Sequence, residues 1–276
     1  MLWNRIILLF IFFLLGKHFG FPNSPRYIEL ADSADFFIAR ENWDRAEETI
    51  LKALRLEPAN FSNSLLLANL GLVQSNKGEY KKAIETLTLG LNIAPSSAVL
   101  LNNRAHTYLL LDDISSASRD IDKSLGIDSL QQWPLQTKAF IYIHENKTDS
   151  AITLLNKLKE NFSDNYSVYK GFASIAENRG DYLEALKNYR EAVKLAPDDD
   201  IELKETFIQL LIKTENYTEA RAELRKAIDG YPENPMFFLL RGYLHKLNFR
   251  LDEAQADKKT AISKGIDPAT ASLYIP

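Results

Sequence analysis

An alanine recurs along this chain at nearly constant spacing, and this period constrains the fold more than any other feature. The separations between successive copies are 37, 34, 34, 34, 35 and 34 residues. A period of this length is typical of arrays in which one small unit is repeated and each unit packs on its neighbours. The recurring residues are Ala46, Ala83, Ala117, Ala151, Ala185, Ala220 and Ala254.

Two further columns of small residues keep the same register. Twelve residues before the alanine the side chain is small in six of the seven units, with Ile208 as the exception, and seven residues after it Leu158 is the exception. Two antiparallel helices approach closely only where their contact points are small, so the columns predict a helix pair in each unit. The columns read Ala34, Gly71, Ala105, Ala139, Ala173 and Gly242, and then Ala53, Gly90, Ser124, Ala192, Ala227 and Ala261.

Two segments carry a known family pattern closely, one through Gly71, Gly78, Tyr80, Ala83 and Pro95 and one through Ala173, Gly180, Tyr182, Ala185, Ala192 and Pro197. On these residues the chain resembles the tetratricopeptide-repeat (TPR) family over residues 27–268. The resemblance implies an all-α, right-handed superhelical solenoid of about seven helix–turn–helix units. We expect units near 27–60, 64–97, 98–131, 132–165, 166–199, 201–234 and 235–268, followed by a C-terminal tail over 269–276.

Residues 1–21 predict an export segment. Arg5 is followed by an apolar run from Ile6 to Leu15, and a basic start before such a run is typical of a secretory signal. The run is shorter than the roughly 20 residues of a membrane-spanning helix. The cleavage site is poorly marked, so an uncleaved membrane anchor over residues 6–21 is the alternative. Either version predicts that the body lies outside the cytoplasm, in the periplasm, the envelope or the extracellular space. Residues 22–26 are expected to form a short spacer.

Composition and motifs argue against several functional classes. The chain has no cysteine, which excludes disulfides and thiolate sites. Its net charge of −4 leaves no basic stripe for nucleic acid. His106, His144 and His245 lie in different units without ligand spacing, so we expect no metal. We expect no cofactor and no catalysis, because no phosphate loop or nucleophile elbow occurs and no unit carries a long insertion.

The family resemblance implies that a partner binds in a concave groove lined by the first helix of each unit. An asparagine amide there can donate to and accept from a peptide backbone, and Trp133 or Phe140 can anchor an apolar side chain. The alternative for each residue is a solvated or core-packing role. The candidate groove residues are Asn69, Leu72, Asn102, Asn103, His106, Trp133, Gln136, Phe140, Lys170 and Gln209.

These observations together predict a non-catalytic scaffold that binds an unidentified protein or peptide. Some family members capture a C-terminal carboxylate with a set of lysines, an arginine and two asparagines. Of that set only Asn69 or Asn103 matches here, so this activity is not expected. A membrane-anchored assembly or secretion accessory factor is the alternative function, and the exposed ends of such an array leave self-association open.

Overall fold

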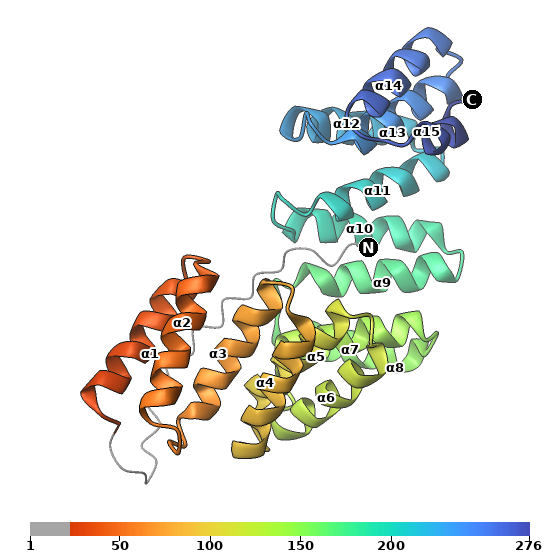
Figure 1. Cartoon of the computed structure of the whole chain (residues 1–276). Coiled ribbons are helices and arrows are strands. Elements are labelled where there is room, and N and C mark those ends of the chain that lie inside the picture. The colour runs from red at the N-terminus through yellow and green to blue at the C-terminus, as the bar shows by residue number, and fades with distance from the viewer. Residues whose placement is uncertain (1–22) are drawn as a thin grey trace. The chain divides into compact units, whose positions relative to one another are not determined.

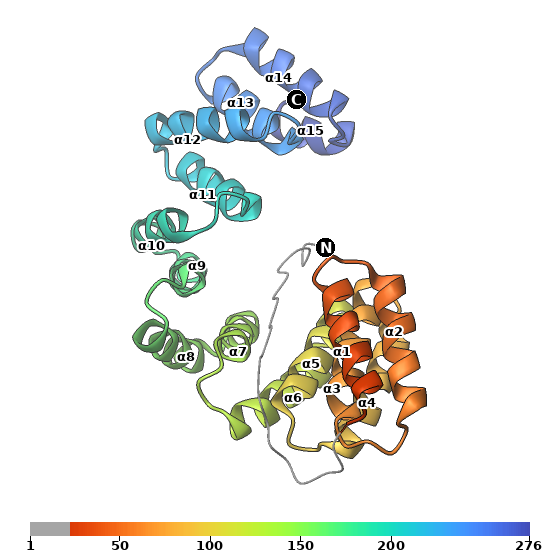
Figure 2. The same cartoon turned by 90° about the vertical axis from the view of Figure 1, so that its left-hand side faces the viewer.

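The computed structural model describes residues 23–276, and throughout this part of the chain the regular structure is helical, with no strand. The predicted export segment over 1–21, with its alternative as a membrane anchor, lies outside the described residues. None of the described helices is both long enough and apolar enough to cross a membrane. Over residues 25–127 and 148–263, successive helices pack side by side as hairpins (Figures 1 and 2).

Fourteen of the described helices alternate as the first and second helix of seven units, here called helix A and helix B. This arrangement confirms the predicted all-α repeat fold. The helices are α1 (Pro25–Ile38) and α2 (Trp43–Leu56), α3 (Asn63–Asn76) and α4 (Tyr80–Ile93), α5 (Ala98–Leu110) and α6 (Ile114–Ile127), α7 (Gln132–His144) and α8 (Thr148–Asn161), α9 (Tyr166–Asn178) and α10 (Tyr182–Leu195), α11 (Ile201–Lys213) and α12 (Tyr217–Gly230), and α13 (Pro235–Leu247) and α14 (Leu251–Ser263), followed by α15 (Pro268–Tyr274).

The chain divides into two compact bodies, with the boundary inside α7. The N-terminal body ends at Ile141, and the C-terminal body begins at Tyr142. Each body has its own apolar core. Ile50 and Val73 are fully buried in the first, and Leu211 and Phe237 are fully buried in the second.

The small residues of the repeat mark the points of closest approach between helices. A Cβ placed on Gly71 would lie 2.4 Å from Leu87 Cγ, and Leu87 stands four residues after the repeated Ala83. A Cβ on Gly90 would lie 2.6 Å from Leu100 Cδ2 on the next helix A. The small residues of the Gly71 column therefore allow close contact with helix B of the same unit, and those of the Gly90 column allow close contact with helix A of the following unit.

Both ends of the described chain differ slightly from the boundaries expected from the sequence. Helix α1 takes in Pro25 and Arg26, two residues of the predicted spacer, because the Ser24 side chain caps the helix and proline suits its first position. At the other end, most of the predicted tail is the helix α15. It packs on α13 and α14 and buries Ala271 and Ile275.

Each turn between helix A and helix B contains one residue with positive φ, always five positions before the repeated alanine. The backbone there follows the pattern that ends many helices, in which the next N–H reaches back five residues. Thus the Glu79 N–H donates to the Gln74 carbonyl at 2.8 Å. The residues with positive φ are Glu41, Gly78, Asp112, Asn146, Gly180, Glu215 and Phe249, with φ between 55° and 79°.

Residues 180 and 249 form a matched pair for testing the strain in this turn. The side chain of Phe249 is 91% exposed, and its φ of 59° is costly for a bulky residue. A Cβ added to Gly180 would meet nothing within 4 Å, so only its φ of 74° opposes a substitution. We expect Gly180→Ala to lower the free energy of unfolding by about 1 kcal/mol and Phe249→Gly to raise it by a few tenths to about 1 kcal/mol. Urea unfolding of both variants measures this, and a stabilised Gly180→Ala would contradict it.

Candidate partner-binding surfaces

Two amides of the N-terminal body form a row across the first three helices A. The Asn69 Nδ2 on α3 donates to Asp35 Oδ1 on α1 at 2.8 Å, and the Asn103 Nδ2 on α5 donates to the Ala68 carbonyl on α3 at 3.2 Å. Within residues 23–276 neither amide oxygen accepts a hydrogen bond. The structure therefore brings these two predicted residues together and leaves acceptor capacity on both.

Asp35 ends this row at α1. Burial raises the pKa of its carboxyl, the neighbouring Asp32 charge raises it further, and the hydrogen bond from Asn69 opposes both effects. The row therefore begins with a carboxyl that protonates more readily than a solvated aspartate.

The structure gives Asn102 a different role from its neighbour Asn103. Its Nδ2 donates to Gln131 Oε1 at 2.8 Å, and the Gln131 Nε2 in turn donates to the Ser124 carbonyl at 3.0 Å. The Asn102 Oδ1 is buried without a hydrogen-bond partner. Asn102 thus ties α5 to the loop that leads into α7, and its side chain is already committed to the fold.

An aromatic pair continues the row onto α7. The rings of His106 and Trp133 meet edge to face with centroids 6.1 Å apart, and Trp133 also packs on the core around α5 and α6. Burial lowers the pKa of His106, so the imidazole is neutral at physiological pH and presents an apolar face. Leu72 on α3 is half-buried, and so are Gln136 and Phe140 on α7.

Apolar side chains at the second position of the repeat unit extend this surface, and they were not among the predicted groove residues. Ile28, Leu65 and Val99 are 46%, 63% and 42% exposed. Trp133 occupies the same register position in the fourth unit, so the repeat itself was the signal that could have identified the three. We call the surface formed by these three side chains together with Asn69, Asn103, His106 and Trp133 the helix-A face of the N-terminal body.

The remaining two candidates lie in the C-terminal body. Lys170 Nζ is 3.7 Å from Glu202 Oε1, which links α9 to α11. Gln209 is exposed and lines a hollow of about 410 Å³ between α11 and α13. Tyr243, which stands 34 residues after Gln209 in the same register, and Tyr274 of α15 also line it, and their rings meet edge to face at 5.6 Å. The period could have predicted Tyr243, but Tyr274 comes from the tail.

Neither surface offers the ligand set of a metal site. Residues 23–276 contain no group of three or more His, Asp or Glu side chains placed to hold an ion. The chemistry available on the helix-A face is hydrogen bonding through amides and contact with apolar and aromatic groups, which suits the recognition of another chain.

Comparison with known proteins decides the family. A tetratricopeptide-repeat model matches residues 66–97, and a model of a domain of unknown function, DUF7017, matches residues 132–236. The crystal structure of a tetratricopeptide repeat protein from Parabacteroides merdae is similar over 91% of this chain and 97% of that chain, with 25% identity and a TM-score of 0.70. The chain is a tetratricopeptide-repeat protein.

Two other TPR similarities cover less of the chain. Sperm-associated antigen 1 from Mus musculus is 34% identical over 88 residues, which are 32% of this chain and 10% of that protein, so this chain matches about a tenth of its relative's length. YrrB, described as a TPR protein with an unusual peptide-binding site, is 18% identical with a TM-score of 0.51, over 69% of this chain and 97% of that chain. That likeness shows the fold. TPR proteins are generally non-catalytic scaffolds for protein–protein interaction.

The partly buried His106 predicts a specific pH dependence of stability. The pKa of His106 is lower in the folded TPR body than the ordinary value of 6.5. As the pH falls below about 6.5, this histidine therefore takes up a proton in the unfolded chain before it does so in the folded chain. The contribution of the neutral His106 to the free energy of unfolding is therefore fully present above about pH 6.5 and is lost as the pH falls below that value. We expect the melting temperature of His106→Gln to fall less than that of the parent between about pH 7.5 and about pH 5.5. Equal falls would show that His106 titrates alike in both states.

Proposed function

We propose that this TPR protein is an exported, non-catalytic scaffold that binds an extended segment of a partner protein on the helix-A face of its N-terminal body. The amide row carries the proposal. Asn69 and Asn103 each present an oxygen that accepts no hydrogen bond from residues 23–276, beside the exposed apolar side chains of the same helices. An extended peptide has backbone N–H groups for the amide oxygens and side chains for the apolar row.

The aromatic pair supplies an anchor point for such a segment. Trp133 is half-buried, and His106 supports its ring from the neighbouring helix. A tryptophan already held by packing loses little side-chain entropy when a partner covers it, and residues of this kind carry much of the energy of interfaces. The peptide-binding site named for YrrB supports the assignment by analogy of fold.

Paired variants of the helix-A face test this function. The parent chain, immobilised, is expected to retain a partner from the source cells. Asn69→Ala with Asn103→Ala is expected to retain it at least about tenfold less well, since each lost hydrogen bond costs about 0.5–1.5 kcal/mol and about 1.4 kcal/mol in total is a factor of ten. Asn103→Ala with Trp133→Ala is expected to lose it entirely. Leu89→Ala with Asn92→Ala, an apolar and amide pair exposed on helix B of the second unit, is the matched control.

The same experiment can contradict the proposal. Circular dichroism of each variant verifies that the fold is intact. A partner that all folded variants retain equally would move the contact away from the helix-A face.

The export proposal rests on the basic and apolar start of the sequence. We expect the protein recovered from the source cells outside the cytoplasm to begin after Gly16 or Gly20. An intact Met1 in the membrane fraction would favour the alternative, a membrane-anchored assembly or secretion accessory factor with the TPR bodies outside the cytoplasm. Recovery of the intact chain from the cytoplasmic fraction would contradict both versions.

A further inference from the structure

Three units carry a cation on helix A, thirteen residues before the repeated alanine, and two of these lie in the N-terminal body. In the third unit Arg104 donates to both carboxylate oxygens of Asp120, at 2.7 and 2.9 Å. Its Nη1 also donates to Thr88 Oγ1 at 2.9 Å, on the preceding helix B. Thr88 stands five residues after its own repeated alanine. The preceding helix B thus offers an oxygen acceptor to this cation.

The next junction repeats the arrangement with a lysine. Lys138 Nζ donates to Ser118 Oγ at 2.6 Å and to Asp122 Oδ2 at 2.8 Å. Both partners lie on the preceding helix B, one and five residues after the repeated alanine. The lysine side chain is only 6% exposed, and a cation buried to this degree requires such acceptors.

The third cation, Arg241 in the C-terminal body, lacks acceptors from its preceding helix. It donates to Asp257 of its own unit at 2.9 and 2.6 Å. The two register positions that hold Ser118 and Asp122 in the earlier unit are occupied on α12 by Arg221 and Arg225. At this junction the repeat therefore places two donors where the Lys138 junction places two acceptors.

No described residue pairs directly with either of these two arginines. Both are exposed, and neither forms an ion pair or a side-chain hydrogen bond with a described residue. Like charges four residues apart on a helix repel one another. The pair thus weakens α12 slightly and leaves two guanidinium groups available to an external anion.

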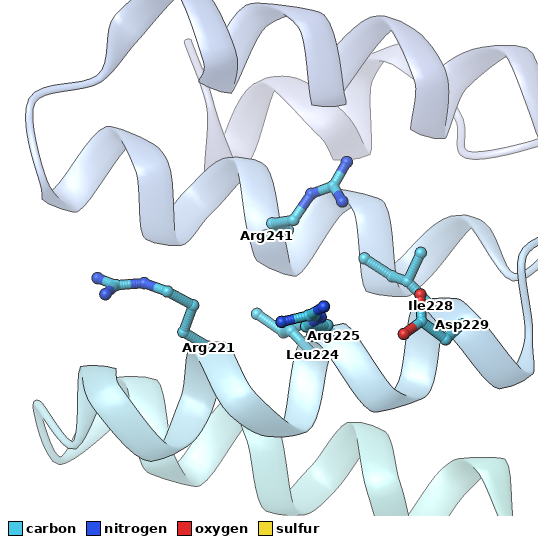
Figure 3. Close-up of a pocket in the computed structure, with 6 residues that line it drawn as sticks. All are labelled: Arg221, Leu224, Arg225, Ile228, Asp229 and Arg241. Atoms are coloured by element: carbon cyan, nitrogen blue, oxygen red, sulfur yellow. The ribbon is translucent and has the colours of Figure 1, made fainter.

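The two arginines border a depression of about 120 Å³ between α12 and α13. Figure 3 shows Arg221 and Arg225 along α12, with Arg241 on α13 directed away from α12. The buried Leu224 and the half-buried Ile228 give the depression an apolar floor. Asp229 lines the end of the depression. The charge of Arg241 is balanced by Asp257. The three charged α12 residues, Arg221, Arg225 and Asp229, therefore leave one net positive charge.

We propose that this depression binds the carboxylates of an acidic segment of a protein partner. Guanidinium groups match carboxylates in charge and in paired hydrogen-bond geometry. Side chains four residues apart on a helix have Cβ atoms about 5–6 Å apart, close to the roughly 6.6 Å between alternate residues of an extended chain. The apolar floor accommodates the methylene groups of a glutamate. The site lies on α12 and α13 of the C-terminal body, so it is independent of the helix-A face proposed above.

Fluorescence anisotropy of a labelled hexaglutamate peptide with the full chain tests this site. We expect the parent to bind, and Arg221→Gln with Arg225→Gln to bind about tenfold or more weakly, as for the loss of charge-assisted hydrogen bonds. Arg55→Gln with Arg119→Gln removes two exposed arginines from the N-terminal body and is the matched control for net charge. It is expected to bind as the parent does, and labelled hexaglutamine is expected not to bind. Equal binding by both double variants, or no binding by the parent up to about 1 mM, would overturn the proposal.

A transplant of the earlier acceptors tests the register comparison separately. Arg221→Ser with Arg225→Asp copies the pair Ser118 and Asp122, so it is expected to lose hexaglutamate binding and to melt at a higher temperature than the parent. A melting temperature at or below that of the parent would contradict the claim that Arg241 lacks acceptors.

Competition identifies the source of the anion. Glutarate is expected to displace hexaglutamate at least as well as inorganic phosphate at equal ionic strength. Displacement by phosphate alone would overturn the assignment to a carboxylate segment.

Discussion

The close approach of neighbouring helices at small residues is the constraint on which the other features of this protein depend. Gly71 lies so near Leu87 that there is no room for a methyl group without movement of the leucine. Gly90 makes the equivalent approach to the following helix A. Because each contact fixes one helix against the next, the position of the backbone in a unit depends on these contacts and not on the surface side chains. The same register position therefore recurs in an equivalent environment along each body.

That regularity makes the surface positions comparable from unit to unit, and the differences among them are informative. At the junction that contains Lys138 the preceding helix B supplies a serine and an aspartate. At the junction that contains Arg241 it supplies Arg221 and Arg225. The packing of the helices tolerates either set, since these side chains lie outside the small-residue contacts. The proposed binding of an external anion would account for two like charges four residues apart that the fold itself does not require.

The turns show the same separation between what the fold requires and what it permits. A left-handed residue is needed in each turn, so that the chain leaves helix A and returns as helix B. Glycine meets this need without strain at positions 78 and 180, whereas Phe249 meets it at a cost and remains exposed. The geometry is therefore imposed by the repeat, and the residue type is left to other demands.

The sequence by itself determined the repeat, its period, the helix pairs and the small residues at their contacts, because close packing imposes a spacing that can be counted. It also placed Asn69, Asn103, His106 and Trp133 at neighbouring register positions. It could not separate Asn103 from Asn102, since only the tertiary structure shows Asn102 committed to Gln131. Nor could it assign Tyr274 to the hollow beside Gln209, because the tail has no preceding copy to compare with. The tertiary structure decided these points because hydrogen bonds and side-chain packing between distant residues depend on distances that a period along the chain does not contain.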